Sequence, residues 1–190
     1  MKIVIDTSSL ISLVRYYLPF DVNFILFNFI KKKIEIEEII ILDKVFEECK
    51  YTAKDIVVKK LTFISERIKK TSNIFPNKKF FNLVENQFCY KSMKNKLSEI
   101  EFEKIKENYL KSADFSIILY GNEASSLNSF EFERPIIVTE ETETKNDNKV
   151  FKKIPEICKM LGIKAITLPE LFNVYCKEKK LNIQFKTYSE

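Results

Sequence analysis

The chain contains no histidine and only two glycines, and these absences exclude several common catalytic designs. Without an imidazole, neither a Ser-His-Asp triad nor a Cys-His pair can form, and histidine ligation of a metal is also excluded. Gly121 and Gly162 are too few and too far apart for the loops G-x-G-x-x-G or G-x-x-x-x-G-K-[ST]. A glycine cradle for phosphate is therefore absent, and any chemistry must rest on other side chains.

Cysteines and long apolar runs are also scarce. The four cysteines, at 49, 89, 158 and 176, never approach C-x-x-C spacing, so we expect buried thiols in a reducing compartment. The longest apolar stretch, FILFNFI, is far shorter than a membrane span. Asp6 interrupts the first apolar run, so no signal peptide is expected. These features predict a soluble, cytoplasmic protein that makes no membrane contact.

The residues that are present suffice for one domain with a core. The chain has 190 residues, of which 45% are hydrophobic. Residues 50–111 hold 15 Lys and Arg against 7 Asp and Glu, whereas the rest of the chain holds 17 against 20. A basic middle between mildly acidic ends suits an anionic polymer as partner. Solvated helix faces in a lysine-rich chain would give the same counts, so both interpretations stay open.

Strand-like and helix-like patterns alternate in both flanks of the chain. Short apolar runs predict strands at 3–5, 39–43, 135–139 and 164–168, each followed by a helical pattern. Another helix is expected from 113 to a close near Gly121, and the segment 54–111 is predicted to be wholly helical. This order predicts an α/β fold with a three-layer, doubly wound, mostly parallel sheet. We expect a single domain, 1–190, with a helical insertion at 54–111.

Acidic residues stand close to the places where the predicted strands end. In open parallel sheets, ligands bind at the carboxyl ends of the strands, so these acids are candidates for a site. They are Asp6, Glu47, Glu48, Asp114, Glu140, Glu141 and Glu143. Each has an ordinary structural explanation, as a helix cap, a first-turn acid favoured by the helix dipole, or part of a solvated loop.

Taken together, the acids favour a metal site. Carboxylates that converge at one edge repel each other, and a hard divalent ion with oxygen ligands would neutralise them. Mg²⁺ or Mn²⁺ held in this way can activate water and stabilise charge on a phosphoryl group. The pattern therefore predicts phosphodiester hydrolysis, which needs neither histidine nor a glycine-rich loop.

Four segments, in order, resemble the motifs of the PIN-domain nucleases. IVIDTSSLI resembles the opening motif, KVFEECK the second, SADFSIILYG the third and IIVTEET the fourth. The end of the chain, KIPEICKMLGIKAITLPELF, is similar to the closing helix–strand–helix of that family. The resemblance covers about residues 1–50 and 112–175, and it is nearest to a PIN-like subgroup whose fourth motif reads Thr-Glu-Glu. The residues that fall on motif positions are Asp6, Glu48, Asp114, Thr139 and Glu141.

Two positions depart from the family pattern or stay open. The fourth motif usually carries Asp where this chain has Glu141, so Glu140 or Glu143 are alternative ligands. In the second motif, the resemblance selects Glu48, and Glu47 stays open as the alternative ligand.

The resemblance implies a PIN-like fold and a Mg²⁺- or Mn²⁺-dependent endoribonuclease, a candidate toxin of a toxin–antitoxin pair. Asp6, Glu48, Asp114 and Glu141 would be the catalytic and metal-binding residues, with Glu140 as a further candidate ligand. Ser8 and Thr139 would hydrogen-bond the acids or a phosphate oxygen. RNA, an antitoxin protein and a second copy of the chain are the expected partners. The lysines expected to contact the RNA backbone are Lys59, Lys60, Lys69, Lys70, Lys78 and Lys79.

Two alternatives compete with this interpretation. A catalytically degenerate PIN-like module could bind nucleic acid or protein without cutting, because Glu141 replaces the usual Asp. A phosphatase of the haloacid-dehalogenase type is disfavoured, because that class needs a second Asp where this chain has Ser8.

Overall fold

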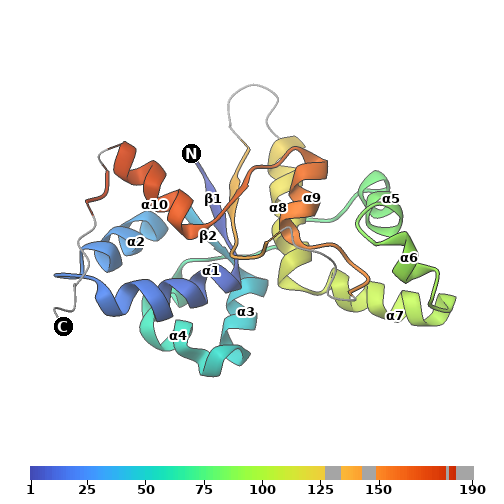
Figure 1. Cartoon of the computed structure of the whole chain (residues 1–190), viewed down its shortest axis with the longest axis horizontal. Coiled ribbons are helices and arrows are strands. Elements are labelled where there is room, and N and C mark those ends of the chain that lie inside the picture. The colour runs from blue at the N-terminus through green and yellow to red at the C-terminus, as the bar shows by residue number, and fades with distance from the viewer. Residues whose placement is uncertain (127–133, 143–148, 179, 183–190) are drawn as a thin grey trace.

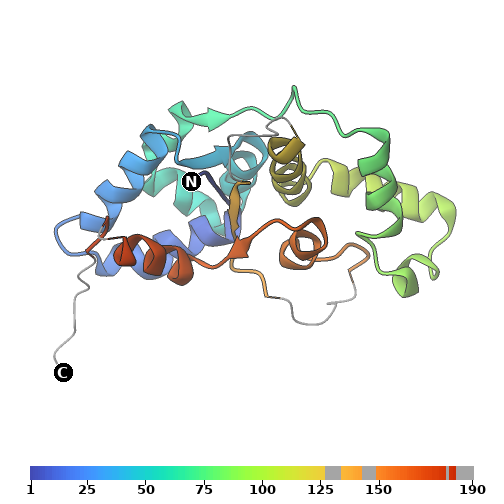
Figure 2. The same ribbon diagram turned by 90° about the horizontal axis from the view of Figure 1, so that it is seen from above.

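The computed structural model describes residues 1–126, 134–142, 149–178 and 180–182. The predicted fold class is confirmed, because a five-stranded parallel sheet lies between layers of helices (Figures 1 and 2). The strand order is β3-β2-β1-β4-β5, and every neighbouring pair is parallel. The strands are β1 (Ile3–Ile5), β2 (Ile39–Leu42), β3 (Ile68–Lys69), β4 (Ile136–Val138) and β5 (Ala165–Ile166).

Helices cover both faces of the sheet. Figure 2 shows α2 and α10 on one face and α8 and α9 on the other, with α5, α6 and α7 beyond α8. The α-helices are α1 (Thr7–Ser12), α2 (Ile25–Glu35), α3 (Asp43–Tyr51), α4 (Ile56–Lys60), α5 (Lys78–Asn86), α6 (Lys91–Lys94), α7 (Glu99–Leu110), α8 (Ala113–Ser126), α9 (Ile154–Leu161) and α10 (Leu168–Lys177). After α1 the chain continues through a π-helical stretch, Leu13–Tyr17, and a 3₁₀ turn, Leu18–Phe20. None of the described helices combines the length and apolar composition needed to cross a bilayer.

The central strand β1 explains why the sheet is stable and where its ligand edge lies. All three residues of β1 are fully buried, as a strand covered on both faces by helices requires. Ile3 pairs with Ile39 of β2 on one side and with Ile136 of β4 on the other. Because the strands are parallel, the residues that follow β1, β2 and β4 all leave from the same edge of the sheet.

The prediction that residues 54–111 are wholly helical was wrong. Ile68 and Lys69 form the edge strand β3, which pairs with Ile41 and Leu42 of β2. The helix expected over this region is broken by left-handed backbone at residues 53–55 and by a 3₁₀ turn over Thr62–Glu66. The open edge of β2 supplies backbone hydrogen-bond partners that local helical periodicity cannot reveal.

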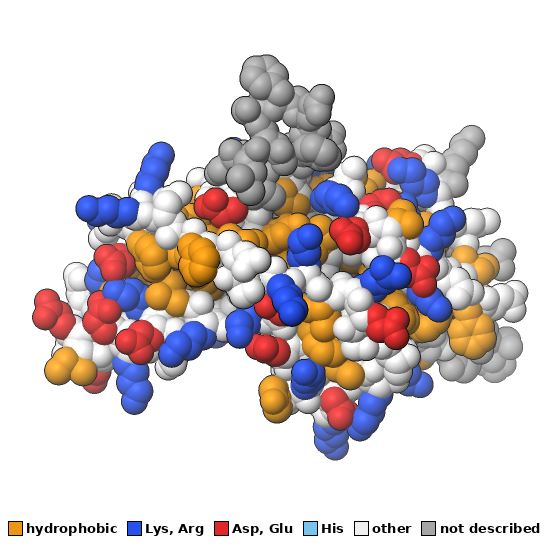
Figure 3. Space-filling view, turned by 180° about the vertical axis from the view of Figure 1, so that it is seen from behind, with side chains coloured by type: hydrophobic (Ala, Val, Ile, Leu, Met, Phe, Trp, Pro, Cys, Tyr) orange, Lys and Arg blue, Asp and Glu red, His pale blue; other side chains and the backbone are white. Residues whose placement is uncertain are grey.

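Lys and Arg side chains lie among Asp and Glu on the face of the molecule that Figure 3 shows.

Two local predictions are also corrected. Helix α8 does not close near Gly121 but continues to Ser126. A Cβ at Gly121 would lie 3.3 Å from Ile137 and 3.3 Å from Ile163, so this glycine lets α8 approach the sheet closely. Three cysteines are buried as expected, but Cys176 is exposed.

Candidate functional site

Asp6 is both a helix cap and the centre of a polar network at the carboxyl edge of the sheet. Its Oδ1 accepts a hydrogen bond from the Thr7 backbone N–H at 2.6 Å, which caps α1. Its Oδ2 accepts from the Ser8 hydroxyl at 2.6 Å and from the Thr139 hydroxyl at 3.0 Å. The residue is only 4% exposed, so its carboxylate is held in a fixed orientation by three donors.

Ser8 and Thr139 tie the segment after β4 to the segment after β1. The Ser8 hydroxyl accepts from the Glu140 backbone N–H at 3.1 Å, and the Thr139 hydroxyl accepts from the Glu141 N–H at 3.2 Å. Each hydroxyl therefore donates a hydrogen bond to Asp6 and accepts one from a backbone N–H of the segment that follows β4. This positions the two glutamates after β4 relative to Asp6.

On α3, the structure separates Glu48 from Glu47. Glu48 Oε2 accepts a hydrogen bond from the Thr7 hydroxyl at 2.6 Å, which places Glu48 beside the Asp6 network. Glu47 instead forms an ion pair with Lys44 at 2.9 Å, and 54% of its side chain is exposed. Both residues are exposed, but Glu48 is joined to the Asp6 network through Thr7, whereas Glu47 is paired with Lys44.

The buried thiol beside Glu48 is held in its neutral form. Burial, followed by the charges of Glu48 and Asp6, raises the pKa of Cys49 to about 12. A thiol with this pKa is neither a nucleophile nor a thiolate ligand near neutral pH. The site therefore offers carboxylate oxygens rather than sulfur.

After β4, the two glutamates have different neighbours. Glu140 Oε1 accepts from the Leu168 backbone N–H at 2.8 Å, so this carboxylate caps the start of α10. Glu141 Oε2 accepts from the Ile154 N–H at 2.9 Å, at the start of α9, and Glu141 also lines a cavity with Asp114. Glu143 lies outside the described residues.

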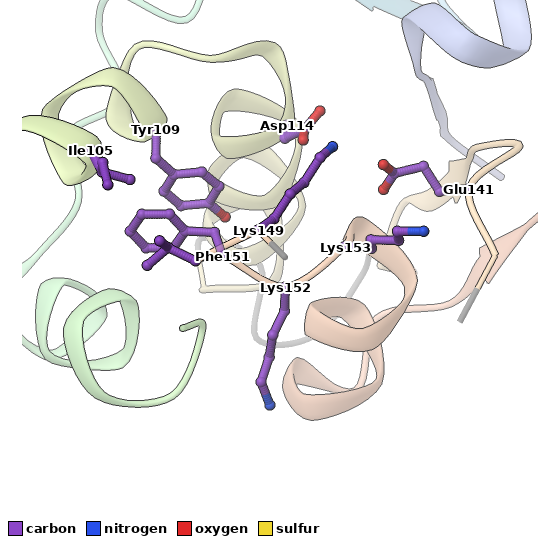
Figure 4. Close-up of a pocket in the computed structure, with 9 residues that line it drawn as sticks. Ile105, Tyr109, Asp114, Glu141, Lys149, Phe151, Lys152 and Lys153 are labelled. Atoms are coloured by element: carbon purple, nitrogen blue, oxygen red, sulfur yellow. The ribbon is translucent and has the colours of Figure 1, made fainter. Parts of the chain in front are cut away.

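Asp114 lies in the first turn of α8, and its pKa is affected by the other acids of the site. Burial first, and then the negative charges of Asp6, Glu141 and Glu48 in that order of size, together raise its pKa to about 7, while the charge of Lys149 lowers it. Figure 4 shows the carboxylates of Asp114 and Glu141 facing each other across the cavity, with the Lys149 ammonium between them. The four predicted acids thus share one electrostatic environment, reached from four separate segments.

The cavity beside these acids has a volume of about 410 Å³. It lies between α7, the start of α8 and the segment 149–153 (Figure 4). Asp114 and Glu141 line one part, and Ile105, Tyr109 and Phe151 line another. Lys149, Lys152 and Lys153 also line it.

The donor set fits a hard cation that keeps much of its water. In the part of the chain that the structure describes, no three Asp, Glu or Cys side chains lie close enough to hold one metal ion by themselves. Mg²⁺ is commonly bound through one or two carboxylates and several waters rather than by an all-protein cage. The carboxylates that raise the pKa of Asp114 suit a cation that keeps several of its waters. A closed structural site, in which protein side chains supply every ligand, does not fit this arrangement.

The lysines predicted to bind RNA come from three separate elements. Lys59 and Lys60 are in α4, where Lys59 pairs with Asp55 at 2.6 Å. Lys69 and Lys70 are at the edge strand β3 and just after it, and Lys78 and Lys79 begin α5. These six lysines do not line the cavity beside the acids.

The lysines that do line this cavity, and Tyr109, were missed from the sequence. Lys149, Lys152 and Lys153 belong to the stretch KVFKK, in which cations alternate with apolar residues around Phe151. A basic stretch with an interleaved aromatic is a sequence signal of nucleic-acid contact. Nothing in the sequence around Tyr109 indicates that this residue lines a cavity.

Comparison with known families adds one finding. Residues 3–176 match the family model described as "Domain of unknown function (DUF4411)", so the chain belongs to that family. No curated protein matches the chain.

Proposed function

We propose that this protein is a metal-dependent endoribonuclease of PIN-like type that hydrolyses RNA phosphodiester bonds. The observation that carries the proposal is the group of four acids at the carboxyl edge of a parallel sheet, whose mutual repulsion helps to raise the pKa of Asp114 to about 7. The order of the four sequence motifs supports the same function.

In this proposal Asp6, Glu48, Asp114 and Glu141 hold Mg²⁺ or Mn²⁺, directly or through water. When bound, such a cation supplies charge stabilisation to a phosphodiester and activates water. The chain's own contribution is to orient the carboxylates. Ser8 and Thr139 fix Asp6, and the Thr7 hydroxyl fixes Glu48. A bound cation would favour the ionised form of Asp114, whose pKa is raised to about 7 in the metal-free protein.

The test is cleavage of a labelled RNA in the presence of Mg²⁺ or Mn²⁺, with EDTA as the metal-free control. Asp6→Asn and Asp114→Asn are expected to abolish cleavage. Glu47→Gln is the matched control, because Glu47 adjoins Glu48 but pairs with Lys44 at the surface. An Asp6→Asn variant as active as the wild type would refute the proposal.

A catalytically degenerate module that binds RNA or a protein is the second candidate. It is favoured by the absence, among the described residues, of three acids close enough to hold a metal on their own. Calorimetric titration with Mn²⁺ separates the two candidates. Saturable binding that Asp114→Asn weakens supports the nuclease, and no heat of binding with intact folding supports the degenerate module.

The toxin role is a further part of the proposal. If the protein is the toxin of a toxin–antitoxin pair, induced expression in bacteria should arrest growth, and Asp6→Asn should relieve the arrest. Unchanged growth with a nuclease that is active in vitro would instead favour a housekeeping role.

A further inference from the structure

The wall of the 410 Å³ cavity is built partly by the helical insertion. An antiparallel bridge joins Cys89 to Phe151, and the Tyr90 N–H donates to the Val150 carbonyl at 2.9 Å. The Lys152 N–H donates to the Phe88 carbonyl at 2.8 Å. These backbone bonds fix the segment 149–153 against the insertion, so the cavity has a defined wall rather than a loose one.

Aromatic rings form the end of the cavity away from Glu141 (Figure 4). Tyr109 and Phe151 stack with their ring centroids 3.9 Å apart and their planes at 5°. Phe115 packs edge-on against Tyr109 at 5.7 Å, behind the stack. Ile105 of α7 adds an aliphatic side chain to the same lining. This end of the cavity therefore suits a flat, largely apolar group.

The Tyr109 hydroxyl is a second, independent sign of a ligand. It is fully shielded from bulk water, and it has no hydrogen-bond partner within the described ranges. Buried hydroxyls nearly always have a partner, because leaving one unpaired costs about 1–3 kcal/mol. A phenol can donate one hydrogen bond and accept others, so a polar ligand in the cavity would satisfy it.

Cations lie among the acids at the other end of the cavity. The Lys149 ammonium points between Asp114 and Glu141, and Lys153 extends near Glu141 (Figure 4). Lys152 extends in another direction and pairs with Glu156 at 2.8 Å. The cavity thus presents an apolar ring surface at one end and ammonium groups mixed with carboxylates at the other.

We propose that this cavity receives one nucleotide of single-stranded RNA next to the cleaved phosphodiester. The base lies against Ile105 and the Tyr109–Phe151 stack, and the flanking phosphate lies beside Lys149. The inference rests on the proposed function, whose substrate it specifies. A purely apolar ligand would leave the Tyr109 hydroxyl unmatched. A base in a duplex would first have to leave its stack, so a single strand is favoured.

The experiment measures binding without cleavage. Fluorescence anisotropy in EDTA compares a labelled hexaadenylate with a hexamer of the same backbone that lacks all bases. The wild type is expected to bind hexaadenylate about 5- to 150-fold more tightly, the range for stacking of one base on a protein aromatic. Ile105→Trp fills the cavity and should remove this preference while keeping affinity for the baseless backbone.

The matched control is Ile100→Trp, which makes the same change on the same helix at a side chain that is 84% exposed. It should retain the wild-type preference for bases. Tyr109→Phe keeps the ring stack and removes only the hydroxyl, and it should reduce the preference about 2- to 10-fold. This variant keeps the inference testable if Ile105→Trp fails to fold.

Equal affinity of the wild type for both oligonucleotides would overturn the inference. So would an Ile105→Trp protein that folds and keeps the preference for bases. Because no cleavage is measured, the two proposals fail separately. An inactive protein that prefers bases refutes the nuclease alone, and an active one without the preference refutes the nucleotide cavity alone.

Discussion

Replacing Asp114 with asparagine removes a charge that burial and three other carboxylates oppose. In the metal-free protein the pKa of Asp114 is raised from 3.8 to about 7. The folded state binds this proton more tightly than the unfolded chain, so protonation of Asp114 stabilises the fold. That stabilisation is fully present below pH 3.8 and is lost as pH rises through 7. At about 1.4 kcal/mol per pKa unit, the full effect is about 4 kcal/mol.

The measurement is the melting temperature of both proteins in EDTA between pH 5 and pH 8. Over this interval the Asp114 contribution to stability falls by about 2–3 kcal/mol in the wild type. A domain of this size changes its Tm by about 2–4 °C per kcal/mol, so the wild type should lose about 5–10 °C more than Asp114→Asn. At pH 8 the variant should be the more stable protein.

Divalent metal provides the second half of the same test. Mn²⁺ at about 100 times its Kd should stabilise the wild type by about 2.7 kcal/mol at pH 8, and the variant by less. If the two proteins lose stability in parallel from pH 5 to pH 8, Asp114 does not experience the negative environment described above. That result would refute the electrostatic reasoning independently of any assay for nuclease activity.

Four further substitutions test other parts of the site and fold. Glu140→Gln should leave RNA cleavage nearly unchanged and lower the free energy of unfolding by at most about 1 kcal/mol, because Glu140 caps α10. Glu141→Gln should abolish cleavage. Equal activities of the two variants would show that the assignment of Glu141, rather than Glu140, to the metal site is wrong. Thr139→Val should cost about 1–3 kcal/mol and slow cleavage, since its hydroxyl bonds both Asp6 and the Glu141 N–H; a stable, fully active variant would contradict this. Gly162→Ala should cost about 1–2 kcal/mol with normal cleavage, because Gly162 has a φ of 66° at the end of α9; an unchanged Tm would be inconsistent with that backbone conformation.

The flanks of the chain could be predicted because their signals are local. Strands buried on both faces read as short apolar runs, and the residues after them must leave from one edge of a parallel sheet. That reasoning was enough to expect Asp6 near the acids of 47–48 and 140–143. The choice of Glu48 and Glu141 among them, and the expectation that Ser8 and Thr139 hydrogen-bond an acid, came from the resemblance to PIN-domain motifs.

The edge strand β3 could not be predicted, because two residues carry almost no strand signal of their own. Val57, Leu61, Ile64 and Ile68 repeat at helical spacing, yet Ile68 pairs with Ile41 in the sheet. What decides the outcome is the unpaired edge of β2, a partner more than twenty residues away. Local periodicity contains no information about such a partner.

The cavity was missed for a similar reason. Tyr109, Asp114 and Phe151 come from two helices and a later segment, and the bridge between Cys89 and Phe151 brings that segment to them. The sequence shows the chemistry of each residue but not this long-range pairing. A prediction based on net charge therefore favoured lysines on α4, β3 and α5, whereas Lys149 lies beside the acids.

The central position of β1 has a consequence for the protein while it is being made. Ile3 is synthesised long before its partner Ile136, which follows more than 130 residues later. At about 5–20 residues per second, on the order of ten seconds separate the synthesis of Asp6 from that of Glu141. During that time one edge of a wholly apolar strand has no partner, and the acids stay apart. A nascent chain of this protein therefore acquires its site only after the segment that follows β4 has been synthesised.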